Sequence, residues 1–160
     1  MSRLRVSSRT EAAVYYVGNE VMRGLIEIIS RSGLSVDDYL LPNKEDYVKA
    51  ISFWLKEQTL NGIELKITDG YDDVIDRWIF EVRYESDGSG IIEFPVEDVI
   101  WELKDYSKYD ISYRITLIID RSASDLSGWI RSDRDEPPSS KYVSSFGYSP
   151  IEVDIKRSYQ

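Results

Sequence analysis

The side chains best suited to chemistry are carboxylates, which gather in three short acidic clusters. The clusters are Asp37-Asp38, Asp72-Asp73-Asp76 and Asp133-Asp135-Glu136. Neighbouring carboxylates can act as a general acid and base, or they can bind a calcium ion. All three clusters fall in predicted loops or helix caps, however, where acidic residues commonly stabilise solvated turns. We keep the Asp72-Asp76 loop as an alternative hypothesis: a carboxylate-based hydrolase or an ion-binding protein.

Other familiar catalytic groups are missing from the sequence. The chain has no histidine and no cysteine, which removes the commonest general base, thiol nucleophiles and almost every zinc site. The turn Asp87-Gly88-Ser89-Gly90 is not followed by the Gly-Lys-Ser/Thr of a phosphate-binding loop. We therefore predict a binding protein rather than an enzyme, with no catalytic residue, metal ligand or cofactor.

The composition is that of one globular domain. The chain has 160 residues, of which 42% are hydrophobic and 31% charged, enough for a single core over residues 1–160. No apolar run approaches the roughly 18 residues of a membrane helix, and the N-terminus lacks the apolar core of a signal peptide. The formal net charge of -9 argues against nucleic acid as a direct partner. We expect a soluble, cytoplasmic protein.

Apolar periodicity predicts the elements that must position a binding surface. Spacings of three and four residues predict a first helix over 9–32 and a second that Asn43 caps and that stops before Asn61. Period-two alternation predicts a strand from Ile63 to Ile67, and Asp69-Gly70 then marks a hairpin. These elements account for the first part of the core.

The following elements complete a small sheet. They are a returning strand over 76–85, a third helix opened by Pro95, and a strand over 111–120. The prediction is an α+β fold in which three helices pack on one face of a three-stranded antiparallel sheet. An edge strand of such a sheet presents unpaired N–H and C=O groups that can pair with an added strand.

The last forty residues differ from this core. Residues 121–141 are rich in Ser, Asp, Arg and Gly and lead past Pro137-Pro138 to a short strand signal at Ile151 to Ile155. Four aromatic residues nevertheless persist there: Trp129, Tyr142, Phe146 and Tyr148. They either anchor this segment over a sheet edge or complete the core. A long irregular segment in a compact domain is usually functional or disordered, and we favour a function here.

An ordered set of short motifs resembles the bacterial HORMA-domain proteins over about residues 8–130. The set comprises the first helix running into Ser32-Gly33-Leu34, Ala50-Ile51 to Trp54-Leu55, Arg77-Trp78, Ser86-Asp87-Gly88 and Gly128-Trp129. The resemblance implies a HORMA fold, in which a C-terminal "safety belt" wraps around a short closure-motif peptide that joins the sheet as a strand. It implies a core over 9–120 and a belt over 121–160.

The resemblance also implies which residues bind the peptide. The receiving edge is the strand from Tyr113 to Ile119, and Trp129 occupies the matching Gly-Trp position. The implied peptide-binding residues are Tyr113, Ile115, Leu117, Ile119, Trp129, Tyr142, Phe146 and Tyr148.

Partners follow from the same resemblance. Similar bacterial proteins belong to CBASS anti-phage operons, where the closed, peptide-bound form activates a cGAS/DncV-like nucleotidyltransferase that makes a second messenger. An AAA+ ATPase reopens them by pulling on the N-terminus. Residues 1–8 are then a flexible arm, with Arg3, Leu4 and Arg5 where the ATPase engages. A plain disordered tail and a constitutive scaffold with a fixed C-terminus remain alternatives.

Overall fold

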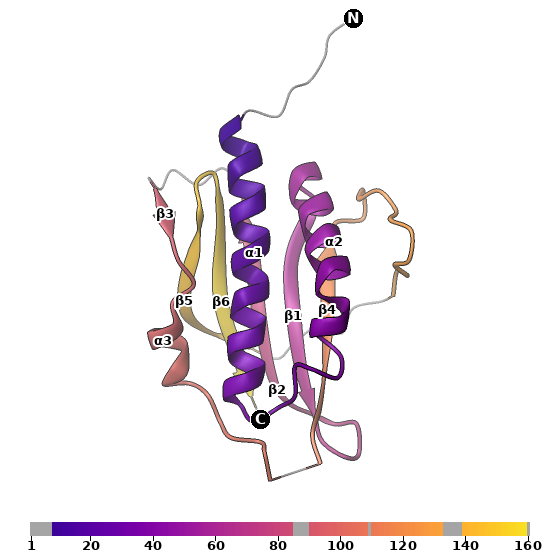
Figure 1. The fold of residues 1–160 in the computed structure, drawn as a ribbon, viewed down its shortest axis with the longest axis vertical. Coiled ribbons are helices and arrows are strands. Elements are labelled where there is room, and N and C mark those ends of the chain that lie inside the picture. Colours follow the sequence, from indigo (N-terminus) through magenta and orange to yellow (C-terminus); the bar gives the residue numbers. More distant parts are fainter. Residues whose placement is uncertain (1–7, 85–89, 109, 133–138, 160) are drawn as a thin grey trace, which may run out of the picture.

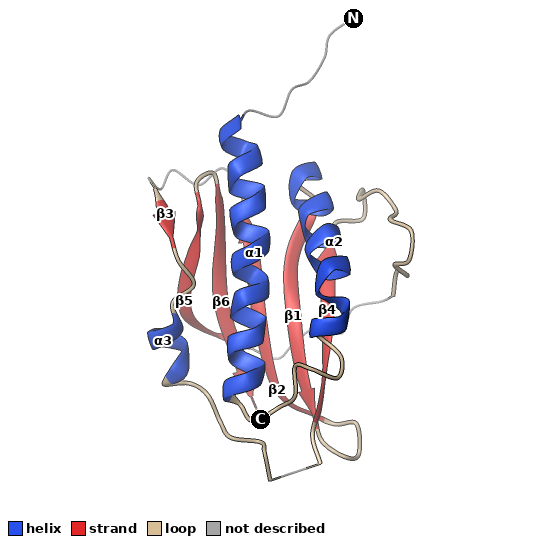
Figure 2. Ribbon diagram, in the orientation of Figure 1, coloured by secondary structure: helices blue, strands red, loops and turns tan. Residues whose placement is uncertain are grey.

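A computed structural model describes residues 8–84, 90–108, 110–132 and 139–159. A single sheet forms one layer, and the long helix α1 lies beside α2 across one of its faces (Figures 1 and 2). The helices are α1 (Ser8–Arg31), the 3-10 turn η1 (Leu41–Asn43), α2 (Lys44–Glu57) and α3 (Val96–Ile100). The strands are β1 (Leu60–Thr68), β2 (Val74–Arg83), β3 (Ile91–Ile92), β4 (Ser112–Ile119), β5 (Lys141–Tyr148) and β6 (Ile151–Tyr159). Within these ranges, no helix is long and apolar enough to cross a membrane.

Over the described residues, the sheet has six strands rather than the three that the sequence predicted. Their order is β3-β5-β6-β2-β1-β4, with every neighbouring pair antiparallel. The α+β class and the three helices are confirmed, and the predicted sheet is the β2-β1-β4 half of the observed one. The other half comes mainly from the C-terminal hairpin of β5 and β6, which pairs along β2.

The amphipathic helices α1 and α2 pack their apolar faces onto the sheet. The valine, leucine and isoleucine residues at three- and four-residue spacing along α1 are buried, with Val17 and Ile28 both 0% exposed. Gly24 of this helix is packed so closely that an added Cβ would lie 2.4 Å from Phe94. Asn43 stands at the predicted N-cap position of α2, but its side chain makes no capping hydrogen bond; its amide N–H donates to the carbonyl of Tyr39 at 2.7 Å.

The strand β5 is the main element that the sequence failed to predict. Its ladder with β6 is irregular between Tyr142 and Ser144, and it carries adjacent serines and Gly147, so period-two alternation is weak. The chain therefore leaves β4 at one edge of the sheet and returns on the far side of β2, to form a hairpin there. This crossing leaves β4 at the end of the sheet.

Candidate functional site

The outer edge of β4 is the first part of the candidate site. Over the described residues, β4 pairs with β1 and with no other strand. Its helix-facing side chains, which we call the inner row, are Tyr113, Ile115, Leu117 and Ile119. Ile115 is buried, whereas the other three are only half-buried although they pack against the core. A further strand beside β4 would cover this remaining apolar surface.

The second part is the segment that follows β4, residues 120–131, which we call the strap. Hydrogen bonds fix it to the C-terminal end of α2. The indole Nε1 of Trp54 donates to the Ser124 carbonyl at 2.9 Å, and the Ser124 backbone N–H donates to the Glu57 carboxylate at 2.8 Å. The Ser124 hydroxyl also donates to Glu57, at 2.5 Å. The two hydrogen bonds that Ser124 donates to Glu57 hold the pKa of the Glu57 carboxyl below its usual range.

The strap is also bonded within itself. The Arg131 Nε lies 2.9 Å from Asp125 Oδ1, and the same guanidinium donates to the Ala123 carbonyl. The backbone N–H of Trp129 donates to the Leu126 carbonyl at 3.1 Å. The strap is therefore an ordered loop with its own contacts, not a loose continuation of the chain.

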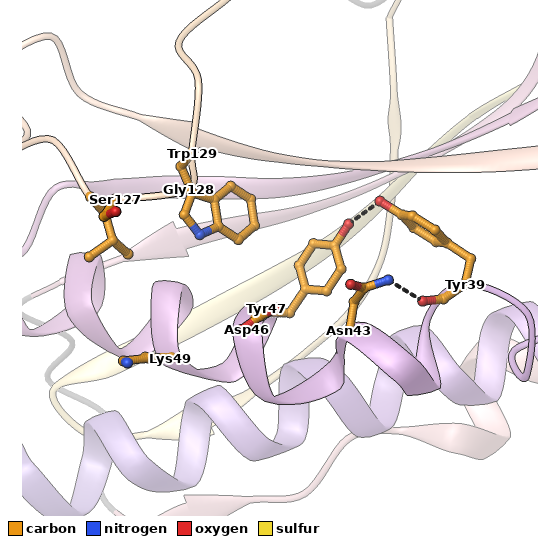
Figure 3. A pocket seen from close by; sticks show the side chains of 9 residues that line it. Tyr39, Asn43, Asp46, Tyr47, Lys49, Ser127, Gly128 and Trp129 are labelled. Carbon is orange, nitrogen blue, oxygen red and sulfur yellow. Dashed lines mark hydrogen bonds between the residues drawn. The ribbon is translucent and has the colours of Figure 1, made fainter.

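A pocket of about 450 Å³ opens between the strap and α2 (Figure 3). Its lining residues are Tyr39, Asn43, Asp46, Tyr47, Lys49, Leu126, Ser127, Gly128 and Trp129. The hydroxyls of Tyr39 and Tyr47 lie 2.5 Å apart and share a hydrogen bond. Burial, followed by this hydrogen bond, raises the pKa of Tyr47, so its phenol stays neutral at physiological pH.

A chain of edge-to-face rings, the aromatic row, joins the β4 edge to the strap. Its members in spatial order are Tyr113, Tyr39, Tyr47, Trp129 and Trp54. Neighbouring ring centroids lie 5.5 to 6.3 Å apart, with interplanar angles of 71° to 84°. The predicted site residues Tyr113 and Trp129 thus belong to one cluster. Sequence reasoning missed Tyr39 and Tyr47, because Tyr47 falls on the apolar stripe of α2 and Tyr39 lies in a short connection.

Three predicted site residues lie elsewhere, and their predicted place over the β4 edge is wrong. Tyr142, Phe146 and Tyr148 all belong to β5, and β6, β2 and β1 separate that strand from β4. Phe146 is 0% exposed and packs against Phe80 and Phe94. Tyr148 contacts a ring of α1, and Tyr142 is 56% exposed. The aromatic residues of the C-terminal segment are therefore divided: Trp129 lies at the strap, and the other three lie on the hairpin.

The acidic loop of the alternative hypothesis does not form a carboxylate site. Asp76 is 1% exposed and accepts hydrogen bonds from Arg157 Nε at 3.1 Å, Arg157 Nη2 at 2.8 Å and the Tyr106 hydroxyl at 2.8 Å. Asp72 is an exposed turn residue, 3.8 Å from Arg114. No group of three or more potential metal ligands occurs within the described part of the chain.

Some predicted residues lie outside the described residues. They are Arg3, Leu4 and Arg5 of the N-terminal arm, and Asp133, Asp135 and Glu136 of the third acidic cluster.

The fold defines a class of protein, that of HORMA domains, and the sequence identifies the family. The model of the family "Bacterial HORMA domain 2" matches residues 1–139, so the chain belongs to this family. HORMA domains are generally binding and regulatory domains rather than enzymes. No curated protein sequence is a significant match.

Solved structures agree on the fold at low sequence identity. A chain of the mitotic checkpoint complex has a TM-score of 0.75 at 14% identity, covering 93% of this chain and 99% of that one. The HORMA protein of Escherichia coli MS115-1, in the structure of a CdnC:HORMA-deltaN complex, has a TM-score of 0.68 at 14% identity, covering 100% and 92%. It is also seen in a HORMA:CdnC:Trip13 complex, with a TM-score of 0.60 at 13% identity, covering 100% and 94%. Caenorhabditis elegans HTP-2 bound to the HIM-3 closure motif has a TM-score of 0.55 at 13% identity, covering 92% and 87%.

Proposed function

We propose that this protein is a regulatory switch that binds an extended closure-motif peptide along the outer edge of β4. The observation that carries the proposal is the state of that edge: β4 is unpaired on its outer side within the described residues, and three members of its inner row are half-buried. A peptide strand would pair with the backbone and cover the inner row at the same time. The structure of HTP-2 bound to the HIM-3 closure motif supports closure-motif binding by a protein of this fold.

The C-terminal segment, residues 121–160, is proposed to act as a belt that holds the peptide. Its first part is the strap, fixed to α2 beside the β4 edge, and its last part is the hairpin on β2. The two attachments lie on opposite sides of the β1-β2 pair. Release of a bound peptide then requires one attachment to open. A ligand shifts this opening equilibrium only by its preference for one of the two states.

The proposed partners are a nucleotidyltransferase and a remodelling ATPase. The E. coli HORMA protein occurs in complexes with CdnC, a cGAS/DncV-like nucleotidyltransferase, and with Trip13, an AAA+ ATPase. We extend both partnerships to this chain, in a CBASS anti-phage system: the closed form binds and activates the enzyme, and the ATPase reopens it. Arg3, Leu4 and Arg5 are the proposed point of engagement.

Peptide binding can be tested by panning a randomised peptide library against the protein and following amide exchange by NMR. In an antiparallel edge strand, alternate N–H groups point outward, and the others already pair with the neighbouring strand. A peptide on β4 should therefore protect every second amide of residues 112–119. Uniform protection, or protection confined to β5, would contradict the proposal.

A charge in the inner row should weaken this binding. Leu117→Asp places a carboxylate where the peptide must cover an apolar surface, and we expect the affinity to fall by at least about tenfold. The matched control is Tyr142→Asp, which adds the same charge to an exposed position of β5 and should leave the affinity unchanged. Synthesis of cyclic nucleotide by the nucleotidyltransferase, measured with protein and peptide together, should show the same ranking.

A further inference from the structure

Backbone pairing along β4 does not by itself select the side chains of a bound peptide. We propose that the pocket between the strap and α2 binds one aromatic side chain of the peptide that pairs with β4. The proposal rests on the proposed function, because the peptide must lie along β4 for its side chain to reach the pocket.

A strand added to β4 would place some of its side chains beside the pocket. Side chains of a strand added to β4 would alternate between the two faces of the sheet, as those of β4 do. Those on the helix side would extend the inner row outward, towards the space beneath α2. The ring of Tyr113 contacts Tyr39 at the pocket wall, with centroids 5.9 Å apart. The inner row and the pocket are therefore continuous, and the next helix-facing side chain along the sheet comes to the pocket.

Aromatic rings form much of the pocket wall. Figure 3 shows Tyr39, Tyr47 and Trp129 arranged around the pocket, with Tyr47 between the other two. Their mutual contacts are edge-to-face, the geometry that a further ring can continue. Gly128 of the strap lines the pocket, and a Cβ added there would meet no atom within 4 Å, so no side chain packs against the strap at this residue. The cavity of about 450 Å³ is within the range of small-ligand pockets, roughly 300 to 1,000 Å³.

The pocket lining carries no net formal charge. The pocket is lined by one carboxylate, Asp46, and one ammonium group, Lys49, and both residues are exposed. Their charges offset each other, and the phenol of Tyr47 is neutral. The pocket therefore selects neither a cation nor an anion. A neutral ring fits this balance, and the polar groups of Asn43 and Ser127 can accommodate a hydroxyl or an indole N–H.

The test compares peptides selected on the wild-type protein with variants of the pocket. Tyr39→Leu removes an aromatic wall at a residue that is 42% exposed, and we expect this variant to fold. Tyr39→Phe keeps the ring and loses only the hydroxyl, and Tyr142→Leu removes a ring from β5. We expect selected peptides to share an aromatic residue at one register position. Replacing it with leucine should weaken binding by about three- to tenfold on the wild type, since ring pairs contribute on this scale.

The double-mutant comparison identifies the pocket. Replacing the aromatic residue of the peptide with leucine should lower the affinity for the Tyr39→Leu variant only slightly. The same replacement should lower the affinity for Tyr39→Phe and for Tyr142→Leu as much as it does for the wild type. If the losses on Tyr39→Leu are additive, or if the selected peptides share a lysine, an arginine or an aliphatic residue instead, the aromatic pocket is wrong. In either case, alternate protection of β4 would still uphold the proposed function.

A small-molecule probe tests the aromatic pocket separately from peptide binding to β4. N-acetyl-tyrosinamide, titrated against the protein, should shift the NMR signals of the Trp129 and Tyr47 rings, and the shifts should be absent in Tyr39→Leu. If no library peptide binds, the proposed function fails, and this titration then decides the pocket alone: shifts at these rings support an aromatic site, and their absence overturns it.

Discussion

The two sides of the central strand pair differ in how their neighbours are held. On one side, β6 pairs with β2 along the full register from Asp76 and Tyr159 to Arg83 and Glu152. On the other side, β4 has β1 as its neighbour and a half-buried inner row towards its outer edge. The first side is sealed by buried charges, and the second presents apolar surface to a strap and a pocket. The molecule thus separates the place that holds its C-terminus from the place that can accept a ligand.

A buried ion pair between Asp76 and Arg157 stabilises the pairing of β2 with β6. The side chains of Asp76 and Arg157 are 1% and 3% exposed, and two hydrogen bonds join them. The guanidinium carbon also lies 4.9 Å from the ring centroid of Trp78, the residue opposite Arg157 in the ladder. Burial alone would lower the pKa of Arg157, but the hydrogen bond and the charge of Asp76 raise it above its ordinary value. A register slip of one residue would move Arg157 to the other face and leave Asp76 unpaired.

The largest expected effect comes from breaking this pair. Arg157→Ala leaves the Asp76 carboxylate buried without its cation, and we expect the free energy of unfolding in urea to fall by about 3–5 kcal/mol. The double variant Asp76→Leu/Arg157→Met should recover most of the loss, because it removes both charges together. A loss below about 1 kcal/mol for the single variant would mean that this ion pair does not stabilise the pairing of β2 with β6. Asp125→Ala, which breaks an exposed pair with Arg131, is the matched control and should cost about 0–1 kcal/mol.

The second effect tests the open side of the comparison. Leu117→Ala removes a half-buried side chain, and we expect about 1 kcal/mol of destabilisation, since full burial of a leucine contributes roughly 1.5–3 kcal/mol. Leu65→Ala, at a β1 position that is 0% exposed and pairs with Ile115 of β4, should cost about 2–5 kcal/mol. Urea unfolding of both variants checks this difference. Equal losses would show that the inner row is covered in the free protein, against the proposed function.

Sequence patterns found the elements whose periodicity is strong. The stripe of α1 and the alternation in β4 predicted both elements and their buried faces, because a helix or a half-covered strand repeats regularly. The same reasoning missed β5, where paired serines and Gly147 break the alternation. It could not place the C-terminal hairpin beside β2, because the choice between two sheet edges depends on contacts such as Asp76 with Arg157, which are 81 residues apart.

The candidate site was predicted in part for the same reason. Tyr113 and Leu117 follow from the alternation of their strand, and Trp129 from its Gly-Trp motif. Tyr39 and Tyr47 carry no local signal that distinguishes them from surface and core residues. Only their contacts with Tyr113 and Trp129 bring them into one aromatic row. A pocket built from three separate segments is a tertiary property, and short-range periodicity does not report it.

The smallest expected effect is a pH dependence of the strap. Ser124 donates two hydrogen bonds to Glu57, and Thr59 donates a third at 2.9 Å, so the folded-state pKa of Glu57 is below its ordinary value of 4.5. Because the folded-state pKa is lowered, the ionised Glu57 carboxylate stabilises the strap fully at pH values above 4.5. This stabilisation is lost as the pH falls through the folded-state pKa. The Trp54 indole N–H, which donates to Ser124, reports this change as an NMR shift during an acid titration. Glu57→Gln should remove the titration step while Glu45→Gln, in the first turn of the same helix, keeps it; an unchanged step in Glu57→Gln would show that another group titrates and that Glu57 does not set the pH dependence of the strap.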